Sequence, residues 1–89
     1  MSYFVYIIKS EVDGTYYKGF SEDPQQRILQ HNNGDSKYTS LKIPWQLIYV
    51  EELPTKRDAL IREKVLKKYS HRQIDQLIVF GKNLVDRFR

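Results

Sequence analysis

Arg27 and His31 are the residues of this 89-residue chain whose types and spacing most directly suggest chemistry. They are four positions apart in a segment with helical start and stop signals, so their side chains share one face of the expected helix. An arginine fork beside an imidazole suits a phosphate group, because it joins bidentate hydrogen bonds to a group that can carry a proton. The more common alternative is an ordinary solvated helix surface, with Ile28 and Leu29 pointing toward the core.

Glu63 is a carboxylate at an unusual place in a second expected helix. It lies four residues after Ala59 and three before Leu66, on or beside the apolar face of that helix. An ionised glutamate is costly to bury without a partner. It therefore either pairs with one of the lysines that follow it or acts as a single carboxylate ligand for Mg²⁺, which needs only one or two carboxylates besides substrate phosphates and water.

Tyr6 and Tyr17 are eleven residues apart, on two expected neighbouring strands, and can point to the same face of a sheet. Tyrosine with its ordinary pKa of about 10 is a poor base, so such a role needs a cation nearby to favour the phenolate. Lys18, Arg27 or Lys37 could supply that cation. The more common alternative is a pair of core tyrosines whose hydroxyl groups are satisfied by hydrogen bonds.

A basic, hydroxyl-rich loop at residues 34–42 (GDSKYTSLK) follows the first helix. Such a loop can lie along a phosphate backbone with Tyr38 as a stacking platform, although a charged solvent loop has a similar composition. The lysine-rich segment at residues 62–68 (REKVLKK) is open to the same two interpretations. The side chains that we predict to contact nucleic acid are Lys18, Lys37, Tyr38, Lys42 and Lys67.

Three strands and three helices are enough to position these residues, and the sequence contains start and stop signals for most of them. The first segment carries β-branched and aromatic residues on both alternating faces, which is typical of a central strand, and Asp13-Gly14 signals a hairpin after it. The predicted strands are residues 3–9, 16–20 and 45–53, and the predicted helices are residues 21–34, 55–68 and 70–81. The fold class is therefore α/β of the α+β type, a three-stranded, mainly antiparallel sheet flanked by helices in the order β-β-α-β-α-α.

Capping residues and the tail complete this framework. The residues that we expect to cap the three helices are Asp23, Thr55 and Ser70. Beyond the last helix, Leu84, Val85 and Phe88 have helical spacing, which predicts a short final turn that docks on the core.

Composition narrows the class of protein. Fifteen Lys and Arg against eleven Asp and Glu give a net charge of +4, a mild indication of polyanionic partners. The absence of cysteine excludes disulfides, thiol catalysis and Cys-ligated zinc. No apolar run approaches the length of a membrane span and no secretory signal is evident, so we expect a cytoplasmic protein with no membrane segment, folded as one domain over residues 1–89.

Several separated segments together form a recognisable pattern. In order they are "FVY", "YKG", "RILQHNNG", "KYTS", "PWQLIYVEE" and "ALIREKVLKK", within residues 3 to about 70. This pattern strongly resembles the GIY-YIG nuclease superfamily, and within it the small single-domain branch related to the catalytic modules of excision-repair and structure-specific endonucleases. The resemblance is specific because the segments agree in both order and spacing.

This resemblance implies hydrolysis of DNA phosphodiester bonds with one divalent ion, Mg²⁺ or Mn²⁺, held by Glu63. It implies that Arg27 stabilises charge on the phosphoryl oxygens. Tyr6 or Tyr17 would help to deprotonate the attacking water, with His31 assisting proton transfer, and the identity of the general base stays open. An involvement in DNA repair is the pathway that the related modules suggest.

The chain also departs from the family pattern. Phe4 stands where the first signature glycine is usual, and Lys18 replaces an apolar residue and should turn away from Tyr17. Gly19 is expected to keep the backbone clear for the substrate or a helix. A family asparagine beyond the glutamate has no secure match, because Asn83 is distant. Two alternatives follow: a catalytically weak or inactive nucleic-acid-binding module, and a protein-interaction domain that uses its apolar tail. We expect the chain to be a monomer or a weak homodimer.

Overall fold

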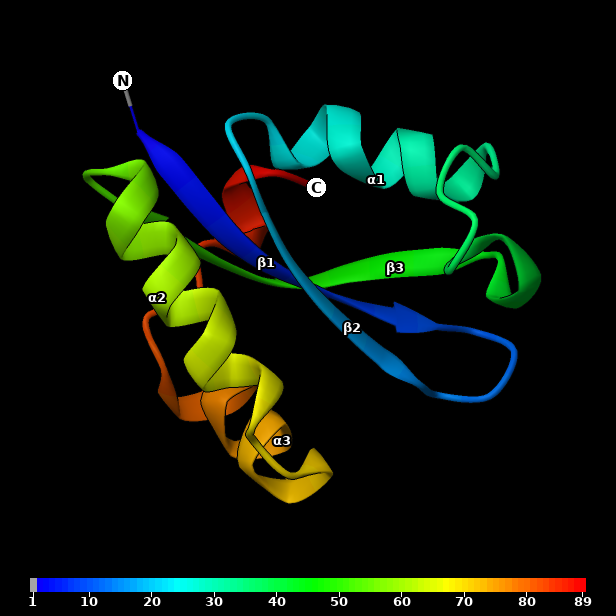
Figure 1. Ribbon diagram of the computed structural model, residues 1–89. Helices are drawn as coiled ribbons and strands as arrows, with labels where there is room; N and C mark the ends of the chain where they lie inside the picture. The colour runs from blue at the N-terminus through cyan, green and yellow to red at the C-terminus, as the bar shows by residue number, and fades with distance from the viewer. Residues whose placement is uncertain (1) are drawn as a thin grey trace.

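A three-stranded antiparallel sheet with strand order β2-β1-β3 forms the framework of the computed structural model, which describes residues 2–89 (Figure 1). The strands are β1 (Tyr3–Ser10), β2 (Tyr16–Ser21) and β3 (Trp45–Leu53). The helices are α1 (Pro24–Asn32), α2 (Lys56–Lys67) and α3 (His71–Phe80), with short 3₁₀ turns η1 (Ser40–Lys42) and η2 (Val85–Arg87). The predicted fold class and order of elements are confirmed. Within residues 2–89 every helix is too short or too polar to cross a membrane.

The central strand β1 is covered on both faces, as its sequence predicts. Val5 and Ile7 pack into one core cluster, and Tyr6 and Ile8 pack into another, all at most 2% exposed. Side chains of a strand alternate between its faces, so β1 contributes to both layers of the molecule.

One face of the sheet, which we call the apolar face, is covered by α2 and α3 (Figure 1). Its buried residues are Val5, Ile7, Ile48, Tyr49, Ala59, Leu66 and Ile74. Complete burial of a large aliphatic side chain contributes about 1.5–3 kcal/mol. This face is therefore a principal source of folding free energy, and it holds α2 in place beside the sheet.

The other face, which we call the α1 face, is covered by α1 and the C-terminal segment (Figure 1). Its buried hydrophobic residues are Tyr6, Ile8, Trp45, Leu47, Val50 and Val85. Two polar side chains, His31 and Thr39, are also 0% exposed. Buried polar groups require hydrogen-bond partners, so this face must satisfy them internally.

The three predicted caps are all confirmed. The side chains of the capping residues accept hydrogen bonds from backbone N–H groups three positions on, at 3.1–3.2 Å. Those at α1 and α2 are Asp23 and Thr55, and Ser70 forms a full capping box with Gln73 at α3. Each cap satisfies a donor that the helix cannot pair.

The C-terminal tail docks on the sheet, as predicted. Leu84 N donates to Val50 O at 2.9 Å, and the Asn83 amide bonds to the backbone of β3 through Val50 N at 3.1 Å and Ile48 O at 2.8 Å. Phe88 packs edge-on against Phe4, with ring centroids 5.1 Å apart. The tail thus covers the outer edge of β3, and its apolar side chains pack against the core of the same chain. Asn83 serves to hold the tail to β3 through these hydrogen bonds.

Candidate active site

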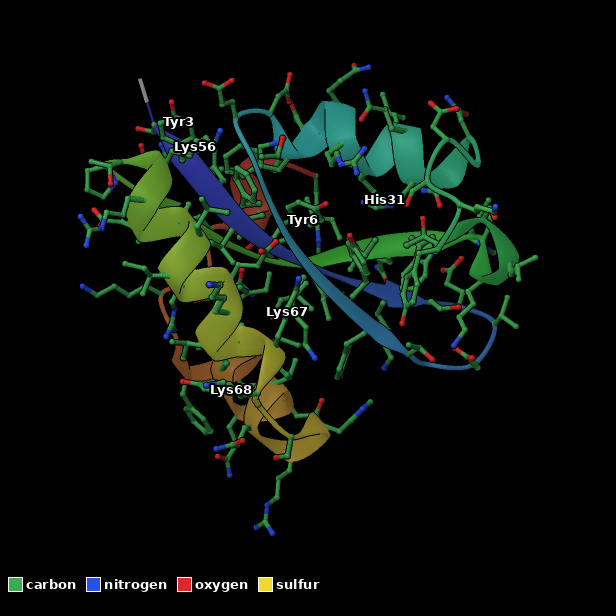
Figure 2. The ribbon with its side chains drawn as sticks, viewed as in Figure 1. Tyr3, Tyr6, His31, Lys56, Lys67 and Lys68 are labelled. Carbon is green, nitrogen blue, oxygen red and sulfur yellow. The ribbon has the colours of Figure 1, made fainter. Side chains whose placement is uncertain are left out.

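Four of the predicted site residues gather on the α1 face. Tyr6 comes from β1 and Tyr17 from β2, and both belong to the same cluster, as predicted. Arg27 and His31 come from α1, which lies across that cluster. Figure 2 shows Tyr6 and His31 between the sheet and α1. Three elements that are separate in sequence therefore bring these side chains together.

A buried hydrogen bond joins Tyr6 Oη and His31 Nε2 at 2.9 Å. The imidazole is 0% exposed, so the solvated helix surface considered for this residue is excluded. The expected burial of Leu29 is wrong, since that side chain is 58% exposed, whereas Ile28 packs on the cluster as expected. The helix turns its Arg27–Ile28–His31 side toward the aromatic cluster, and Leu29 lies outside that contact.

Burial determines the protonation of this pair. It raises the pKa of Tyr6 to about 12, and it outweighs the positive charge of Arg27, which acts in the opposite direction. Burial also lowers the pKa of His31 to about 4, and the Arg27 charge adds to that decrease. At neutral pH the resting site therefore holds a neutral phenol bonded to a neutral imidazole. A nearby cation does not suffice to favour the phenolate.

Thr39 and Trp45 are residues of this site that the sequence did not reveal. Thr39 Oγ1 lies 2.8 Å from His31 Nδ1, on the far side of the ring from Tyr6. The backbone carbonyl of Thr39 accepts a hydrogen bond from Trp45 Nε1 at 2.8 Å. The available signal was the "KYTS" segment, because a buried histidine requires partners for both ring nitrogens.

Tyr17 links this pair to the surface. Its ring meets His31 edge-on, with centroids 5.1 Å apart, and lies 5.7 Å from the ring of Tyr38. Tyr38 is 72% exposed, as a stacking platform must be. The rings of Tyr17 and Tyr38 therefore form a continuous aromatic path from the buried imidazole to solvent.

An open groove of about 440 Å³ runs past this surface. Its lining residues are Tyr16, Tyr17, Lys18, Tyr38 and Lys67. Three of the five predicted nucleic-acid contacts thus meet in one place. Lys18 pairs with Ile7 in the sheet register and lies on the face opposite Tyr17, as predicted, and burial lowers its pKa.

The other two predicted contacts lie outside the lining of this groove. Lys37 is exposed on the loop before η1. Lys42 is held by the hairpin turn, with its Nζ 3.1 Å from both the Asp13 carboxylate and Thr15 Oγ1. These two contacts join η1 to the hairpin turn.

Glu63 lies on α2 with its side chain only 15% exposed. Lys67 Nζ is 3.7 Å from its Oε1, so the carboxylate has the lysine neighbour considered from the sequence. Its negative charge acts to raise the pKa of Tyr6, which places Glu63 within electrostatic reach of the tyrosine–histidine pair.

The donor set can be tested against the metal that the resemblance implies. Within residues 2–89 no group of three or more His, Cys, Asp or Glu side chains could hold an ion. That composition does not fit a structural zinc site, which needs four protein ligands. It does fit Mg²⁺, which is commonly held by one or two carboxylates with substrate phosphates and water completing the shell. Glu63 is the carboxylate that would hold it.

Gly19 makes room for Tyr6 itself. The two residues pair across β1 and β2, and a Cβ atom at Gly19 would lie 2.6 Å from Tyr6 Oη and 2.7 Å from Tyr6 Cζ. The space was expected to serve the substrate or a helix, and that expectation is wrong. The second glycine of the signature allows the tyrosine ring of the first strand to reach α1.

Comparison with known proteins gives a consistent result. The model of the GIY-YIG catalytic domain matches residues 2–75. The UPF0213 proteins of Staphylococcus saprophyticus and Staphylococcus epidermidis are each 41% identical over 80 residues, which cover 89% of this chain and 96% of theirs. The solution NMR structure of a UPF0213 protein from Bacillus halodurans has a TM-score of 0.57 and 33% identity, and the match covers 92% of this chain and 88% of that one.

Proposed function

The chain belongs to the GIY-YIG catalytic-domain family, and from this premise we propose that it is a metal-dependent endonuclease that hydrolyses DNA phosphodiester bonds. The observation that carries the proposal is the buried hydrogen bond between Tyr6 and His31, with Arg27 beside it. A neutral, buried donor–acceptor pair at the edge of a basic groove is suited to moving a proton during attack on a phosphate.

In this proposal, Tyr6 passes a proton rather than storing a negative charge. As water attacks phosphorus, Tyr6 Oη takes the water proton and gives its own to His31 Nε2. The bond from phosphorus to the 3′-oxygen breaks, and that oxygen leaves as an alkoxide that takes up a proton from solvent. In the resting site this transfer is unfavourable, because burial raises the pKa of Tyr6 and lowers that of His31. An anionic phosphate nearby favours the protonated imidazole and so promotes the transfer.

Arg27 is the group that would meet the phosphoryl oxygens. It is half-buried on α1, and its Nη1 donates to Gln30 Oε1 at 2.8 Å, which steadies the guanidinium. Its charge already acts on both Tyr6 and His31, so it lies close to the reacting pair. A fixed guanidinium stabilises charge that develops on phosphate oxygens in the transition state.

Glu63 would hold the single divalent ion. Such an ion would supply Lewis-acid stabilisation of the negative charge that develops in the reaction. The carboxylate is largely covered and its charge reaches Tyr6, which suits a ligand at the border of the proton-transferring pair.

The groove would bind the nucleic acid. Lys18 and Lys67 supply positive charge, and Tyr38 offers an exposed ring next to Tyr17. Lysines that contact phosphates release counterions, so binding weakens steeply as salt rises, and aromatic rings can stack on bases of any sequence.

Incubation of the purified protein with labelled branched, flapped, nicked and single-stranded DNA tests the proposal. We expect cleavage with Mg²⁺ or Mn²⁺ that EDTA abolishes and that Glu63→Gln lowers by about 10²-fold or more. Glu22→Gln, at an exposed carboxylate, is the matched control and should cleave normally. Cleavage that persists undiminished in EDTA and in Glu63→Gln would contradict a metal at Glu63.

The same assay addresses a second candidate, a nucleic-acid-binding module without catalysis. The groove favours it, because the lysines and exposed tyrosine there suffice for binding. That candidate predicts DNA binding that is sensitive to salt, indifferent to Mg²⁺ and to Glu63→Gln, and accompanied by no cleavage of any substrate.

A further inference from the structure

We propose that Thr39 is a positioning residue, which holds His31 in the tautomer that carries its proton on Nδ1 and leaves the Nε2 lone pair free to accept the proton of Tyr6. The catalytic meaning of this assignment rests on the proposed nuclease function. The tautomer itself can be measured whether or not the protein cleaves DNA.

The first observation is the pair of hydrogen-bond partners of the Thr39 hydroxyl group. Its Oγ1 lies 2.8 Å from His31 Nδ1 and donates toward Ser36 O at 3.4 Å. A hydroxyl group has one hydrogen to donate and lone pairs to accept with. The Ser36 carbonyl can only accept, so both neighbours of Oγ1 are satisfied together only when the hydroxyl donates to that carbonyl and accepts from Nδ1–H. This arrangement assigns the ring proton to Nδ1.

The second observation is at the opposite edge of the ring. A neutral imidazole has one donor and one acceptor nitrogen, so a proton on Nδ1 leaves Nε2 as the acceptor for Tyr6 Oη, 2.9 Å away. The donors then run in one direction, from Tyr6 to His31 to Thr39 to Ser36. In the other tautomer Nε2 would carry a hydrogen directed at the phenol, and Tyr6 could not pass its proton to the ring.

The third observation is that Thr39 is fixed within an otherwise exposed loop. Its side chain is 0% exposed, whereas its neighbour Tyr38 is 72% exposed and Leu41 is 89% exposed. Trp45 Nε1 donates to the Thr39 carbonyl at 2.8 Å, and Ser40 N donates to Ser36 O at 3.0 Å. The backbone on both sides of the hydroxyl is thereby held, and the hydroxyl has little freedom to turn away from the imidazole.

A threonine methyl group alone would explain burial but not these contacts. The tautomer of a histidine is set by the hydrogen bond that its other nitrogen makes. Thr39→Val keeps the shape of the side chain and replaces the hydroxyl group, with its acceptor oxygen and its one hydrogen, by a methyl group. Thr39→Ser keeps the hydroxyl group and removes the methyl group. These two variants therefore separate positioning from packing.

The decisive measurement is long-range ¹H–¹⁵N correlation NMR of the histidine rings in the ¹⁵N-labelled full chain at pH 7. We expect His31 in the native protein and in Thr39→Ser to show a protonated Nδ1 and an unprotonated Nε2. In Thr39→Val the proton should shift to Nε2 in a substantial fraction of molecules. The exposed ring of His71 serves as the internal reference and should not change.

A native protein whose His31 carries its proton on Nε2, or a Thr39→Val variant that retains the Nδ1 proton, would overturn the assignment. Thermal unfolding checks that the variants fold, and Thr39→Ala replaces Thr39→Val if the latter does not. The smaller variant also removes the oxygen, so the expected change in tautomer is the same.

The cleavage assay gives an independent reading. We expect Thr39→Val to lower kcat about 10- to 100-fold with KM unchanged and Thr39→Ser to restore it, since residues that orient a functional histidine have effects of this size. Native-like kcat in Thr39→Val would overturn the positioning role even if the tautomer changes. A native protein that cleaves no DNA would instead overturn the nuclease proposal, and the NMR result would still decide the tautomer.

Discussion

Two buried tyrosines, one on each face of the sheet, show how a partner decides what a side chain can do. Tyr6 lies on the α1 face at 2% exposed and Tyr49 lies on the apolar face at 1% exposed. Tyr49 donates to the Glu51 carboxylate at 2.6 Å, and Arg62 Nε bonds the same carboxylate at 3.1–3.2 Å. Tyr6 is instead hydrogen-bonded to His31.

The difference lies in whether the partner can change its protonation. Glu51 and Arg62 form an ion pair with both charges compensated, and burial together with Glu51 raises the pKa of Tyr49 further from neutrality. His31 is neutral, with its pKa lowered to about 4 by burial, and one of its ring nitrogens is available as an acceptor. The first arrangement fixes a fold and the second can transfer a proton, although both begin with the same residue type.

The largest expected effect comes from removing each phenolic oxygen in turn. Tyr6→Phe should lower the cleavage rate by about 10²–10⁴-fold, the usual contribution of a positioned proton-transferring group. Tyr49→Phe should leave cleavage unchanged. Each variant loses one buried hydrogen bond, so the unfolding free energy in urea titrations should fall by about 1 kcal/mol for Tyr6→Phe and by about 1.5–3 kcal/mol for Tyr49→Phe, whose partner is a carboxylate. Equal losses of activity in the two variants would contradict the assignment of proton transfer to Tyr6 and of a purely structural role to Tyr49.

The two arginines give a second matched pair. Arg27→Met should lower kcat by about 10²-fold, because it removes charge stabilisation near the phosphate, with a small change in stability. Arg62→Met should leave kcat unchanged and lower the unfolding free energy by about 1–2 kcal/mol, because Glu51 loses its partner. Single-turnover cleavage and urea denaturation measure both quantities. An Arg27→Met protein that cleaves at the native rate would remove that residue from the mechanism.

The fold could be predicted because its signals are local. Residues 3–9 are recognisable as a central strand from their own composition, and Asp13-Gly14 forms the turn that it predicts, with φ of 77° at Gly14. Asp23 caps α1 as its position before Pro24 suggests. The strand, the turn and the helix cap each depend on a few neighbouring residues, so they can be predicted from the sequence without knowledge of the tertiary structure.

The structure brings together several residues that the sequence proposed for a site, but the sequence did not predict the environment in which they lie. Periodicity placed Leu29 in the core and left it open whether the Arg27–His31 pair faces solvent or a groove, because polar residues under a helix carry no apolar signal. The partners Thr39 and Asp13 act across loops and turns, the first on His31 and the second on Lys42. Such contacts depend on how elements pack, which one sequence does not display.

The last expected effect is on the pH dependence of stability, and it asks whether the partner of Tyr6 is neutral in the fold. The pKa of His31 is about 4 in the folded protein and about 6.5 when unfolded, so between these values the unfolded chain binds a proton that the native site excludes. Its contribution is therefore fully present above pH 6.5 and is lost as pH falls toward 4, by up to about 3 kcal/mol.

His31→Gln should flatten this dependence, while His71→Gln, at an exposed ring that stacks on Tyr16, should retain the native slope. Urea denaturation at pH values from 4 to 7 measures the slope in all three proteins. A native slope that His31→Gln leaves intact would mean that His31 already carries its proton in the fold. Tyr6 would then face a charged imidazolium with no free acceptor nitrogen. It could not transfer its proton to His31, just as Tyr49 cannot transfer its proton within the ion pair on the apolar face.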